Sequence, residues 1–170
     1  MKLCYWLTLC LSCAPALCSA ADEPTNFRVG VGSWQLSIDP GQPDSDDRGI
    51  ALMAEFPQSE HAGSRFLYYR QQGEQGYWLH GVETQLFWGW GLNQPGWRLF
   101  SGPSWYWQKS HSDQQSHQVH NGWGWHLGTG WQWQALILDV SASYRLPDEY
   151  RVNGKTPDVT TTNLMLSYRF

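Results

Sequence analysis

Cysteine is missing from almost the whole sequence. All four cysteines lie within the first 18 of its 170 residues, at Cys4, Cys10, Cys13 and Cys18. If that segment is removed on export, the mature chain has no thiol, which excludes disulfides, cysteine-ligated metals and cysteine nucleophiles. Small secreted domains often depend on disulfides for their stability. This chain must therefore be stabilised in another way.

Long hydrophobic runs, helical periodicity and basic patches are absent as well. After the N-terminal segment no apolar run approaches the length of about 18 residues that a membrane-spanning helix needs. The formal net charge is −4, and the loss of Lys2 would lower it by one further unit. Without a basic patch, nucleic acid is not an expected partner. Short alternating segments, separated by clusters of Gly, Pro, Asp, Asn and Ser, predict an all-β fold instead.

The N-terminus has the three parts of a signal peptide. Lys2 is followed by an apolar run from Leu3 to about Leu17, and then by small residues up to Ala20. This predicts a signal peptide over 1–20, cleaved after Ala20 or Ala21, and a single domain over 21–170. Lipid attachment to a cysteine is the alternative, but neither Cys13 nor Cys18 stands in a good sequence context for it.

Tryptophan is abundant, and only Trp6 of the 12 tryptophans precedes residue 21. The chain divides into candidate strands at 26–38, 48–57, 65–71, 77–90, 97–108, 120–132, 135–146 and 160–170. Their connections at 39–47, 109–119 and 147–159 are long and polar, whereas most others are short, including 72–76, where a long one is expected. This pattern predicts an eight-stranded antiparallel transmembrane β-barrel of the outer-membrane type.

The segment 120–132 gives a geometric test of this interpretation. Trp123 and Trp133 share one face and lie ten residues apart, or roughly 33 Å along a strand. A tilt of about 40° projects that distance to roughly 25 Å, which is the height of the apolar band of a barrel. The opposite face carries Gly and polar residues that suit a narrow lumen. A soluble β-sandwich would instead need four tryptophans in one core stripe. We therefore expect two aromatic girdles, formed by Trp88, Trp90, Trp105, Trp107, Trp123, Trp125, Trp131 and Trp133.

Three features fit the alternation poorly. In 26–38 the apolar residues change parity, which a β-bulge near Gly32 and Ser33 would repair. In 65–71 the facing cannot be assigned, because consecutive aromatic and aliphatic residues compete for both faces. Pro103 falls inside a strand, where a closed sheet in lipid needs every N–H.

Charged residues recur at positions that should face the lumen. They are Arg28, Glu55, Glu83, Arg98, His126, Asp139 and Arg145. An eight-stranded barrel is just wide enough for side chains to fill it. We expect these residues to form a hydrogen-bonded, ion-paired polar plug. The alternative is a narrow ion path that opens when the pairs rearrange.

The last strand is amphipathic and ends in an aromatic residue. Leu164, Leu166, Tyr168 and Phe170 share one face, and mostly polar residues occupy the other. This is typical of a barrel wall between lipid and lumen, and it resembles the closing strand that the outer-membrane assembly machinery reads.

The connection 109–119 and the residue after it contain three histidines, His111, His117 and His120. Together with Asp113 they could ligate a metal, and together with Ser112 and Asp113 they could build a nucleophile–base pair. The spacing matches no strong motif for either, so no metal site, cofactor or catalytic residue is assigned and an enzyme is the less favoured class.

The signal peptide, the barrel pattern and the terminal 164–170 segment resemble the small outer-membrane barrels of the OmpA/OmpX-like group. That resemblance implies a monomer in the outer membrane of a Gram-negative bacterium, in contact with outer-membrane lipid, lipopolysaccharide and the assembly machinery. It also implies a structural or surface-interaction role, with an extracellular ligand at the loops 39–47, 109–119 and 147–159. A weaker similarity links the chain to PagL-type lipid A deacylases. Their His-x-Ser motif is missing here, because the matching strand has Ser141 and Ser143 without a histidine. A lipid A-modifying hydrolase or acyltransferase therefore stays an alternative only.

Overall fold

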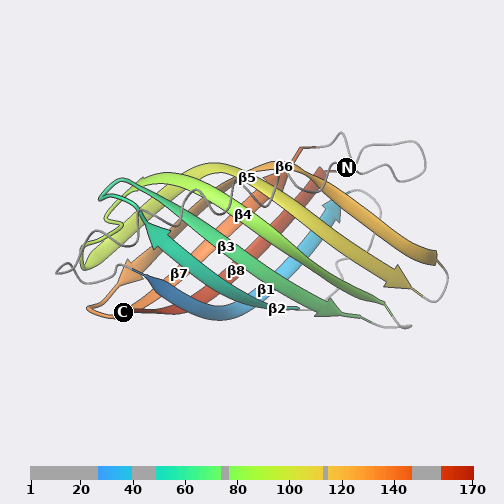
Figure 1. Cartoon of the computed structure of the whole chain (residues 1–170), viewed down its shortest axis with the longest axis horizontal. Helices are drawn as coiled ribbons and strands as arrows, with labels where there is room; N and C mark the ends of the chain where they lie inside the picture. Colours follow the sequence, from blue (N-terminus) through green and yellow to red (C-terminus); the bar gives the residue numbers. More distant parts are fainter. Residues whose placement is uncertain (1–26, 40–48, 74–76, 113–114, 147–157) are drawn as a thin grey trace, which may run out of the picture.

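The computed structural model describes residues 27–39, 49–73, 77–112, 115–146 and 158–170 (Figure 1). The expected signal peptide and most of the expected loops 39–47 and 147–159 lie outside these residues. Among the described residues, no helix is long and apolar enough to cross a membrane.

Eight antiparallel strands form a closed barrel, as the sequence predicts. Each strand pairs with the next, and β1 pairs with β8 along its whole length, from Arg28 opposite Arg169 to Asp39 opposite Asp158. Closure leaves no exposed sheet edge, which is a requirement for strands in lipid. The strands are β1 (Arg28–Asp39), β2 (Gly49–Pro57), β3 (Ala62–Gln72), β4 (Trp78–Trp90), β5 (Gly96–Ser112), β6 (Gln115–Gln132), β7 (Leu136–Arg145) and β8 (Asp158–Arg169).

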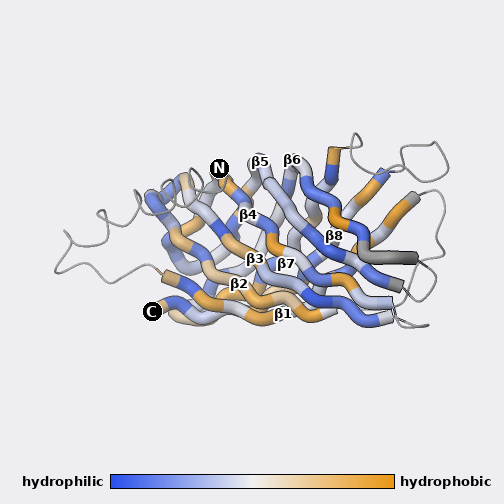
Figure 2. The backbone as a smooth tube through the Cα atoms, turned by 45° about the vertical axis from the view of Figure 1, so that its right-hand side comes forward, coloured by the Kyte–Doolittle hydropathy of each residue, from blue (hydrophilic) through white to orange (hydrophobic). Residues whose placement is uncertain are grey.

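Side chains alternate between the lumen and the outer wall with period two. In β7, for example, Leu138 and Val140 are exposed, while Asp139 and Ser141 are buried. Figure 2 shows hydrophobic and hydrophilic residues alternating along the strands. The wall that faces outward is thus apolar, as expected for contact with hydrocarbon.

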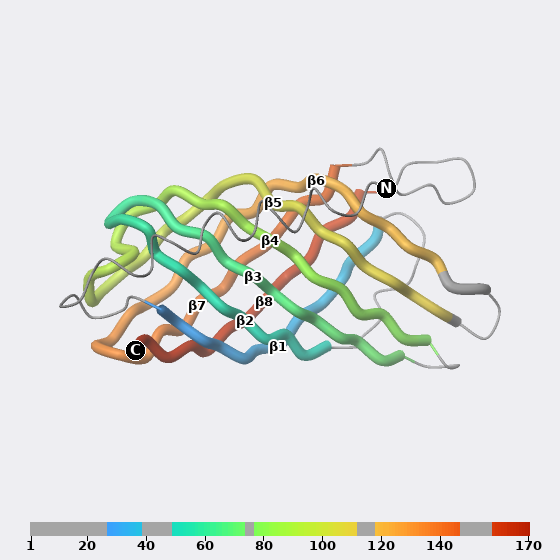
Figure 3. Tube along the Cα trace, in the orientation of Figure 1, coloured from blue at the N-terminus to red at the C-terminus, as the bar shows by residue number. Residues whose placement is uncertain are grey.

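The C-terminus and the start of β1 lie at the same end of the barrel, here called the termini end (Figure 3). Phe170 N donates a hydrogen bond to Phe27 O at 3.0 Å. The connections 58–61, 91–95 and 133–135 are at this end and are short. In outer-membrane barrels short turns face the periplasm, so the other end is expected to be extracellular.

The prediction of a loop over 109–119 is wrong. β5 continues to Ser112 and β6 begins at Gln115, with paired residues from Lys109 opposite Val119 outward to Ser112 opposite Gln115. The two strands therefore form a long hairpin that extends beyond the others (Figure 3). Water surrounds both faces of a hairpin beyond the membrane, so its sequence carries no apolar alternation to reveal the strands.

The prediction of a β-bulge in β1 is also wrong. β1 pairs with β2 and β8 without a register shift, and Trp34 and Leu36 are buried inside the barrel. The apolar residues of β1 change parity for another reason. Val29 and Val31 face outward, whereas Trp34 and Leu36 are apolar residues that face the lumen. In β3, whose facing was open, Leu67 and Tyr69 are buried, and the residues between and beside them are exposed.

An apolar cluster fills the lumen toward the end opposite the termini, where the sequence predicted a polar interior. Its members are Trp34, Leu36, Ala51, Met53, Leu67, Tyr69, Leu79, Tyr106, Val159 and Met165. Trp34 stacks on Tyr69 with ring centroids 4.2 Å apart and planes 6° from parallel. The lumen toward this end is thus mixed, because the apolar cluster surrounds the buried polar residues Gln108 and Arg145, whereas most of the buried charges lie toward the termini end.

Pro103 is accommodated by a local break in one ladder. β5 pairs with β6 through this position, with Pro103 opposite Trp125. On its other side β5 pairs with β4, and this pairing is interrupted at Gly102 and Pro103. The β4 residues that pair with β5 are those from Trp78 to Gln85 and from Trp88 to Trp90. The barrel therefore keeps its register across the missing N–H.

Candidate functional site: the ion-paired lumen

Glu55 of β2 is the centre of an ion-pair network at the termini end of the lumen. Cross-strand pairing places Arg28 of β1 on one side of it and Arg65 of β3 on the other. Arg28 Nη1 lies 2.6 Å from Glu55 Oε1, and Arg65 Nη2 lies 2.5 Å from Glu55 Oε2. Arg98 reaches across from β5, with its Nη2 2.8 Å from Glu55 Oε1. One carboxylate thus binds three guanidinium groups.

Asp139 of β7 closes the network on the far wall. Arg65 Nη2 lies 2.9 Å from Asp139 Oδ2, and Arg98 Nε lies 3.5 Å from Asp139 Oδ1. Arg65 and Arg98 therefore bridge two carboxylates that come from opposite sides of the barrel. Because the bridges cross the lumen, they connect β2, β3, β5 and β7 in a single polar layer.

All five charged side chains are at most 1 % exposed. Charges in such an environment are tolerated only when they are paired and hydrogen-bonded. Three arginines face two carboxylates, so the network keeps one excess positive charge. Aromatic faces support two of the guanidinium groups, since Arg65 lies 4.6 Å and Arg98 5.2 Å from the ring centroid of Phe100.

Glycines on β6 make room for this layer. A Cβ on Gly128 would lie 2.3 Å from Phe100 Cζ, and one on Gly130 would lie 2.1 Å from Asp139 Oδ1. Both distances are far shorter than van der Waals contact. Because these glycines have no side chain, Phe100 and Asp139 occupy the space beside them.

The β4–β5 turn covers the network at the termini end. Leu92 is fully buried against Phe87 and Phe100, and its carbonyl accepts a hydrogen bond from Arg28 Nη2. Asn93 O accepts a hydrogen bond from Arg169 Nη1 at 3.1 Å. Gly91, with φ of 69°, allows the chain to fold back at this point. The turn thus closes the barrel mouth with an apolar side chain.

Arg145 and Glu83 form separate clusters farther along the lumen. The Arg145 guanidinium lies 4.0 Å from the ring centroid of Tyr106, and its Nη2 donates to Tyr69 Oη at 3.1 Å. Glu83 Oε1 accepts hydrogen bonds from Gln85 Nε2 and Ser143 Oγ, both at 2.9 Å. Neither residue joins the Glu55 network.

The structure buries all seven lumen residues named from the sequence, and it brings four of them together: Arg28, Glu55, Arg98 and Asp139. His126 packs instead between Phe87 and Phe100, with ring centroids 6.2 and 6.1 Å away. Sequence reasoning missed Arg65 and Leu92. Arg65 could have been found from the β2–β3 hairpin, because the register places it directly opposite Glu55.

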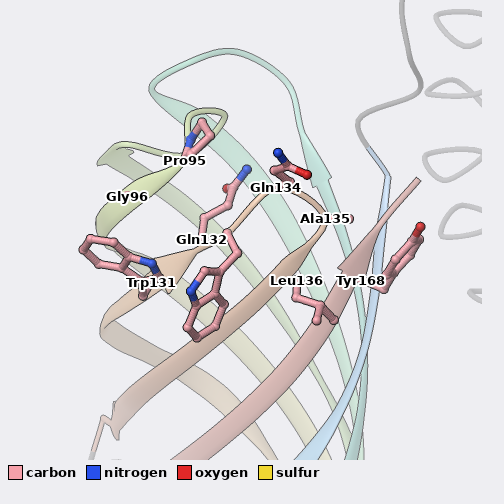
Figure 4. Close-up of a pocket in the computed structure, with 9 residues that line it drawn as sticks. Pro95, Gly96, Trp131, Gln132, Gln134, Ala135, Leu136 and Tyr168 are labelled. Carbon is pink, nitrogen blue, oxygen red and sulfur yellow. The ribbon is translucent and has the colours of Figure 1, made fainter.

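The tryptophans expected in the girdles are on the outer wall. Trp88, Trp90, Trp123, Trp125, Trp131 and Trp133 are exposed, and Trp105 and Trp107 are partly exposed. Beside the β6–β7 turn, Trp131, Leu136 and Tyr168 line a shallow groove on this wall (Figure 4). The outward residues Leu164, Leu166, Tyr168 and Phe170 of the terminal segment are exposed as well.

The three histidines considered for a metal or catalytic site lie on the β5–β6 hairpin. His111 contacts Trp78 on the outer wall, with ring centroids 5.7 Å apart. His120 pairs with the buried Gln108 and so shares the lumen side. His117 is on β6, but its side chain is outside the described part of the structure. Within the described residues, no group of three or more His, Cys, Asp or Glu side chains is placed to hold a metal.

Comparison with known proteins identifies the architecture. No protein-family model and no curated protein matches the sequence. Among solved structures, Neisserial surface protein A aligns with a TM-score of 0.67 at 12% identity, over 88% of this chain and 100% of that one. The N-terminal β-barrel domain of Pseudomonas aeruginosa OprF aligns with a TM-score of 0.55 at 10% identity, covering 87% and 100%.

The attachment invasion locus protein Ail of Yersinia pestis is a third neighbour. It aligns with a TM-score of 0.54 at 15% identity, over 85% of this chain and 96% of Ail. Ail has also been crystallised with the heparin analogue sucrose octasulfate, and that structure aligns with a TM-score of 0.51. The chain therefore has the fold of the small eight-stranded outer-membrane barrels.

Proposed function

We propose that this chain is an outer-membrane protein that interacts with extracellular ligands through the end of the barrel opposite the termini. In this proposal the segment 1–20 directs export and is removed, and the barrel is inserted as a monomer by the outer-membrane assembly machinery. Two observations support the location. The outer wall is apolar with tryptophans toward both ends, and the structural neighbours are outer-membrane barrels.

The length of the β5–β6 hairpin carries the surface-interaction part of the proposal. β5 has 17 residues and β6 has 18, whereas a tilted strand spans the bilayer with about 9–11. About six residues on each strand thus lie beyond the hydrocarbon core, a length of roughly 20 Å along the strand. A paired hairpin has a fixed backbone, which lowers the entropy cost of binding.

The filled lumen suits a scaffold better than a passage. The Glu55 network and Leu92 occupy the termini end, and the apolar cluster around Trp34 fills the rest together with the Glu83 and Arg145 clusters. A rigid interior would hold the base of the hairpin in place. Interaction through surface loops on a rigid barrel is the common arrangement for binding proteins of this shape.

A sulfated glycan is the first ligand class to test, because Ail, a structural neighbour, has been crystallised with a heparin analogue. The experiment displays the protein on bacteria that lack other adhesins and measures retention on immobilised heparin and on cultured epithelial cells. In the test variant, 110–118 is replaced by Asn-Gly, which joins Lys109 to the opposed Val119 by a two-residue turn.

The shortened hairpin should lose retention while the protein remains heat-modifiable on gels, which reports a folded barrel. The matched control replaces the short connection 133–135 at the termini end with a different turn sequence. Unchanged retention of the shortened variant on both surfaces would contradict the role of the hairpin.

A narrow ion path is a second candidate, favoured by unpaired polar groups on one wall. Ser141 of β7 is opposite Asn163 of β8, and Ser167 lies farther along β8. Their side-chain polar atoms are buried and have no protein partner in the described structure. Buried polar groups without protein partners usually bind ordered water. Water along β7 and β8 would lead toward Asp139 and the network.

Planar bilayer recording separates the two candidates. A closed scaffold gives no single-channel steps in the wild type. A gated path gives rare steps in the wild type and more frequent ones in Asp139→Asn, which weakens the bridge from Arg65 and Arg98 across the lumen. Glu60→Gln, an exposed change outside the lumen, is the control.

A further inference from the structure

Three basic side chains form a row across neighbouring strands of the outer wall. Arg70 of β3 is directly opposite His80 of β4, and His80 is directly opposite Lys109 of β5. Residues opposed in this way share a face, with Cβ atoms about 4.5–5.5 Å apart. The face is the outer one, because exposed Val82 has the same parity as His80 on β4. These three residues are called the basic row.

The basic row lies where the apolar band ends on the extracellular side. His80 is ten residues from Trp90 on β4, roughly 33 Å along the strand and roughly 25 Å along the membrane normal at a tilt of about 40°. That is the full height of the apolar band. The next outward residues toward the termini end are Tyr68, Val82 and Trp107, which are apolar or aromatic. The row is therefore at the level of the lipid headgroups.

Aromatic rings flank the basic row and fix its central member. The Trp78 ring stacks on the His80 imidazole, with centroids 4.9 Å apart and planes 7° from parallel. Trp107 approaches His80 from the other side, with centroids 6.4 Å apart. Trp rings at this level of a membrane protein contact both acyl chains and headgroups. The row is thus embedded in a surface suited to lipid.

The described residues supply no counter-charge for this row. All five ion pairs in the described structure are in the lumen, and none involves Arg70 or Lys109. Basic side chains grouped on adjacent strands repel one another when nothing neutralises them. The outward residues of β4 and β5 at the opposite interface are Trp88, Trp90 and Trp97, without Lys or Arg. The outward positive charge on these two strands is thus confined to the extracellular interface.

We propose that the basic row binds a phosphate group of a phosphorylated glycolipid, namely lipopolysaccharide, in the extracellular leaflet. Arg70 donates paired hydrogen bonds to the phosphate oxygens, as guanidinium groups do. Lys109 adds a second positive charge and His80 a further donor from the middle of the row. Trp78 and Trp107 contact the sugar ring and the first methylene groups. The row continues the lipid-facing wall, so the headgroup and the acyl chains are bound by one surface.

This inference rests on the proposed orientation in the outer membrane, but it does not depend on the β5–β6 hairpin binding any extracellular ligand. The test uses the mature protein refolded in detergent, with heat-modifiability as proof of folding. Native mass spectrometry then measures retention of diphosphoryl lipid A, monophosphoryl lipid A, phosphatidylglycerol and phosphatidylcholine. The test variant is Arg70→Gln with Lys109→Gln.

The wild type should retain diphosphoryl lipid A most strongly and phosphatidylcholine least. The double variant should lose lipid A affinity by about tenfold or more, which corresponds to one charge-assisted hydrogen bond of about 1.4 kcal/mol or more. Two control variants are used. One keeps both positive charges of the row, and the other removes a positive charge elsewhere on the barrel. Arg70→Lys with Lys109→Arg preserves both charges and should retain most of the binding. Arg169→Gln removes a cation at the termini end and should leave lipid A binding unchanged.

Two results would overturn the proposal. Equal lipid A affinity in the wild type and the double variant would show that the basic row does not bind the headgroup. Equal affinity for phosphatidylglycerol and lipid A, lost together in the double variant, would show a general anionic-lipid surface and not a glycolipid site. Both readouts are independent of heparin retention, so failure of the hairpin proposal and failure of this one remain distinguishable.

Discussion

Glu55 and Arg65 are directly opposite each other across the β2–β3 hairpin, and both Nε and Nη2 of Arg65 donate to the same carboxylate oxygen, at 2.9 and 2.5 Å. A hairpin is the shortest connection between two strands, so this pair forms as soon as β2 and β3 are in register. The other two arginines then bind the remaining oxygen from β1 and β5. The network is therefore built on a local pair and completed by closure of the barrel.

Replacing Glu55 by Gln should destabilise the barrel strongly. The change leaves Arg28, Arg65 and Arg98 buried with only Asp139 to balance them. Removing one partner from a buried ion pair typically costs about 3–5 kcal/mol. Urea unfolding in detergent or lipid, followed by heat-modifiability, measures the free energy of unfolding. Glu60→Gln, on an exposed connection residue, is the matched control and should change little. Equal stability of the two variants would contradict a central role for Glu55.

Gly128→Ala should destabilise the barrel through a clash that a second change relieves. The added Cβ would lie 2.3 Å from Phe100 Cζ, and overpacking of this kind typically costs about 1–3 kcal/mol. Phe100→Leu removes the ring atoms that the new methyl group meets. The double variant should therefore be more stable than the sum of the two single effects predicts, by a double-mutant cycle on urea midpoints. Additive effects would show that the Gly128 site is not in contact with Phe100.

The sequence predicted most of the fold, because lipid imposes a strict alternation on the strands that it touches. β6 and β7 show this clearly, with tryptophan or aliphatic residues on one face and small or polar residues on the other. The prediction failed where that constraint is absent. The outer part of the β5–β6 hairpin has water on both faces, so nothing in its sequence distinguishes strand from loop.

The site was predicted in part, for a related physical reason. Arg28, Glu55, Arg98 and Asp139 stand out because a charged side chain on a lipid-spanning strand must point into the lumen and find a partner there. Arg65 precedes four consecutive apolar residues, Phe66 to Tyr69, which hide the facing of β3. Its parity becomes visible only when the register with β2 is known. Leu92 lies in a turn, where no periodicity indicates that a side chain enters the lumen.

Trp34→Ala should cost much more stability than Trp90→Ala, although both replace a tryptophan of the barrel. Trp34 is fully buried against Tyr69 in the apolar lumen cluster, whereas Trp90 is 72 % exposed on the outer wall. Truncating a buried tryptophan leaves a cavity and typically costs about 3–5 kcal/mol. Urea unfolding of both variants in the same detergent gives the comparison. A larger loss of stability for Trp90→Ala would instead support a β-bulge in β1 that places Trp34 on the lipid face.

Deletion of Phe170 should impair assembly in cells more than it lowers the stability of the refolded barrel. Phe170 is exposed at the termini end, where its ring stacks on Phe27 with centroids 6.1 Å apart and its N–H donates to Phe27 O. These contacts lie outside the ion-paired layer, so their loss should cost the folded state little. The terminal aromatic is, in contrast, the feature that resembles the signal read by the assembly machinery.

Two measurements distinguish these effects. Outer-membrane fractions of cells expressing each variant give the assembled amount, and urea unfolding of refolded protein gives the stability. Phe170→Tyr keeps an aromatic ring and should assemble at close to the wild-type level. The deletion should reduce the assembled amount several-fold while its unfolding midpoint remains near that of the wild type. An equal loss in both measurements would show that Phe170 acts through the stability of the barrel. A recognition signal has no effect on protein that is refolded without the assembly machinery.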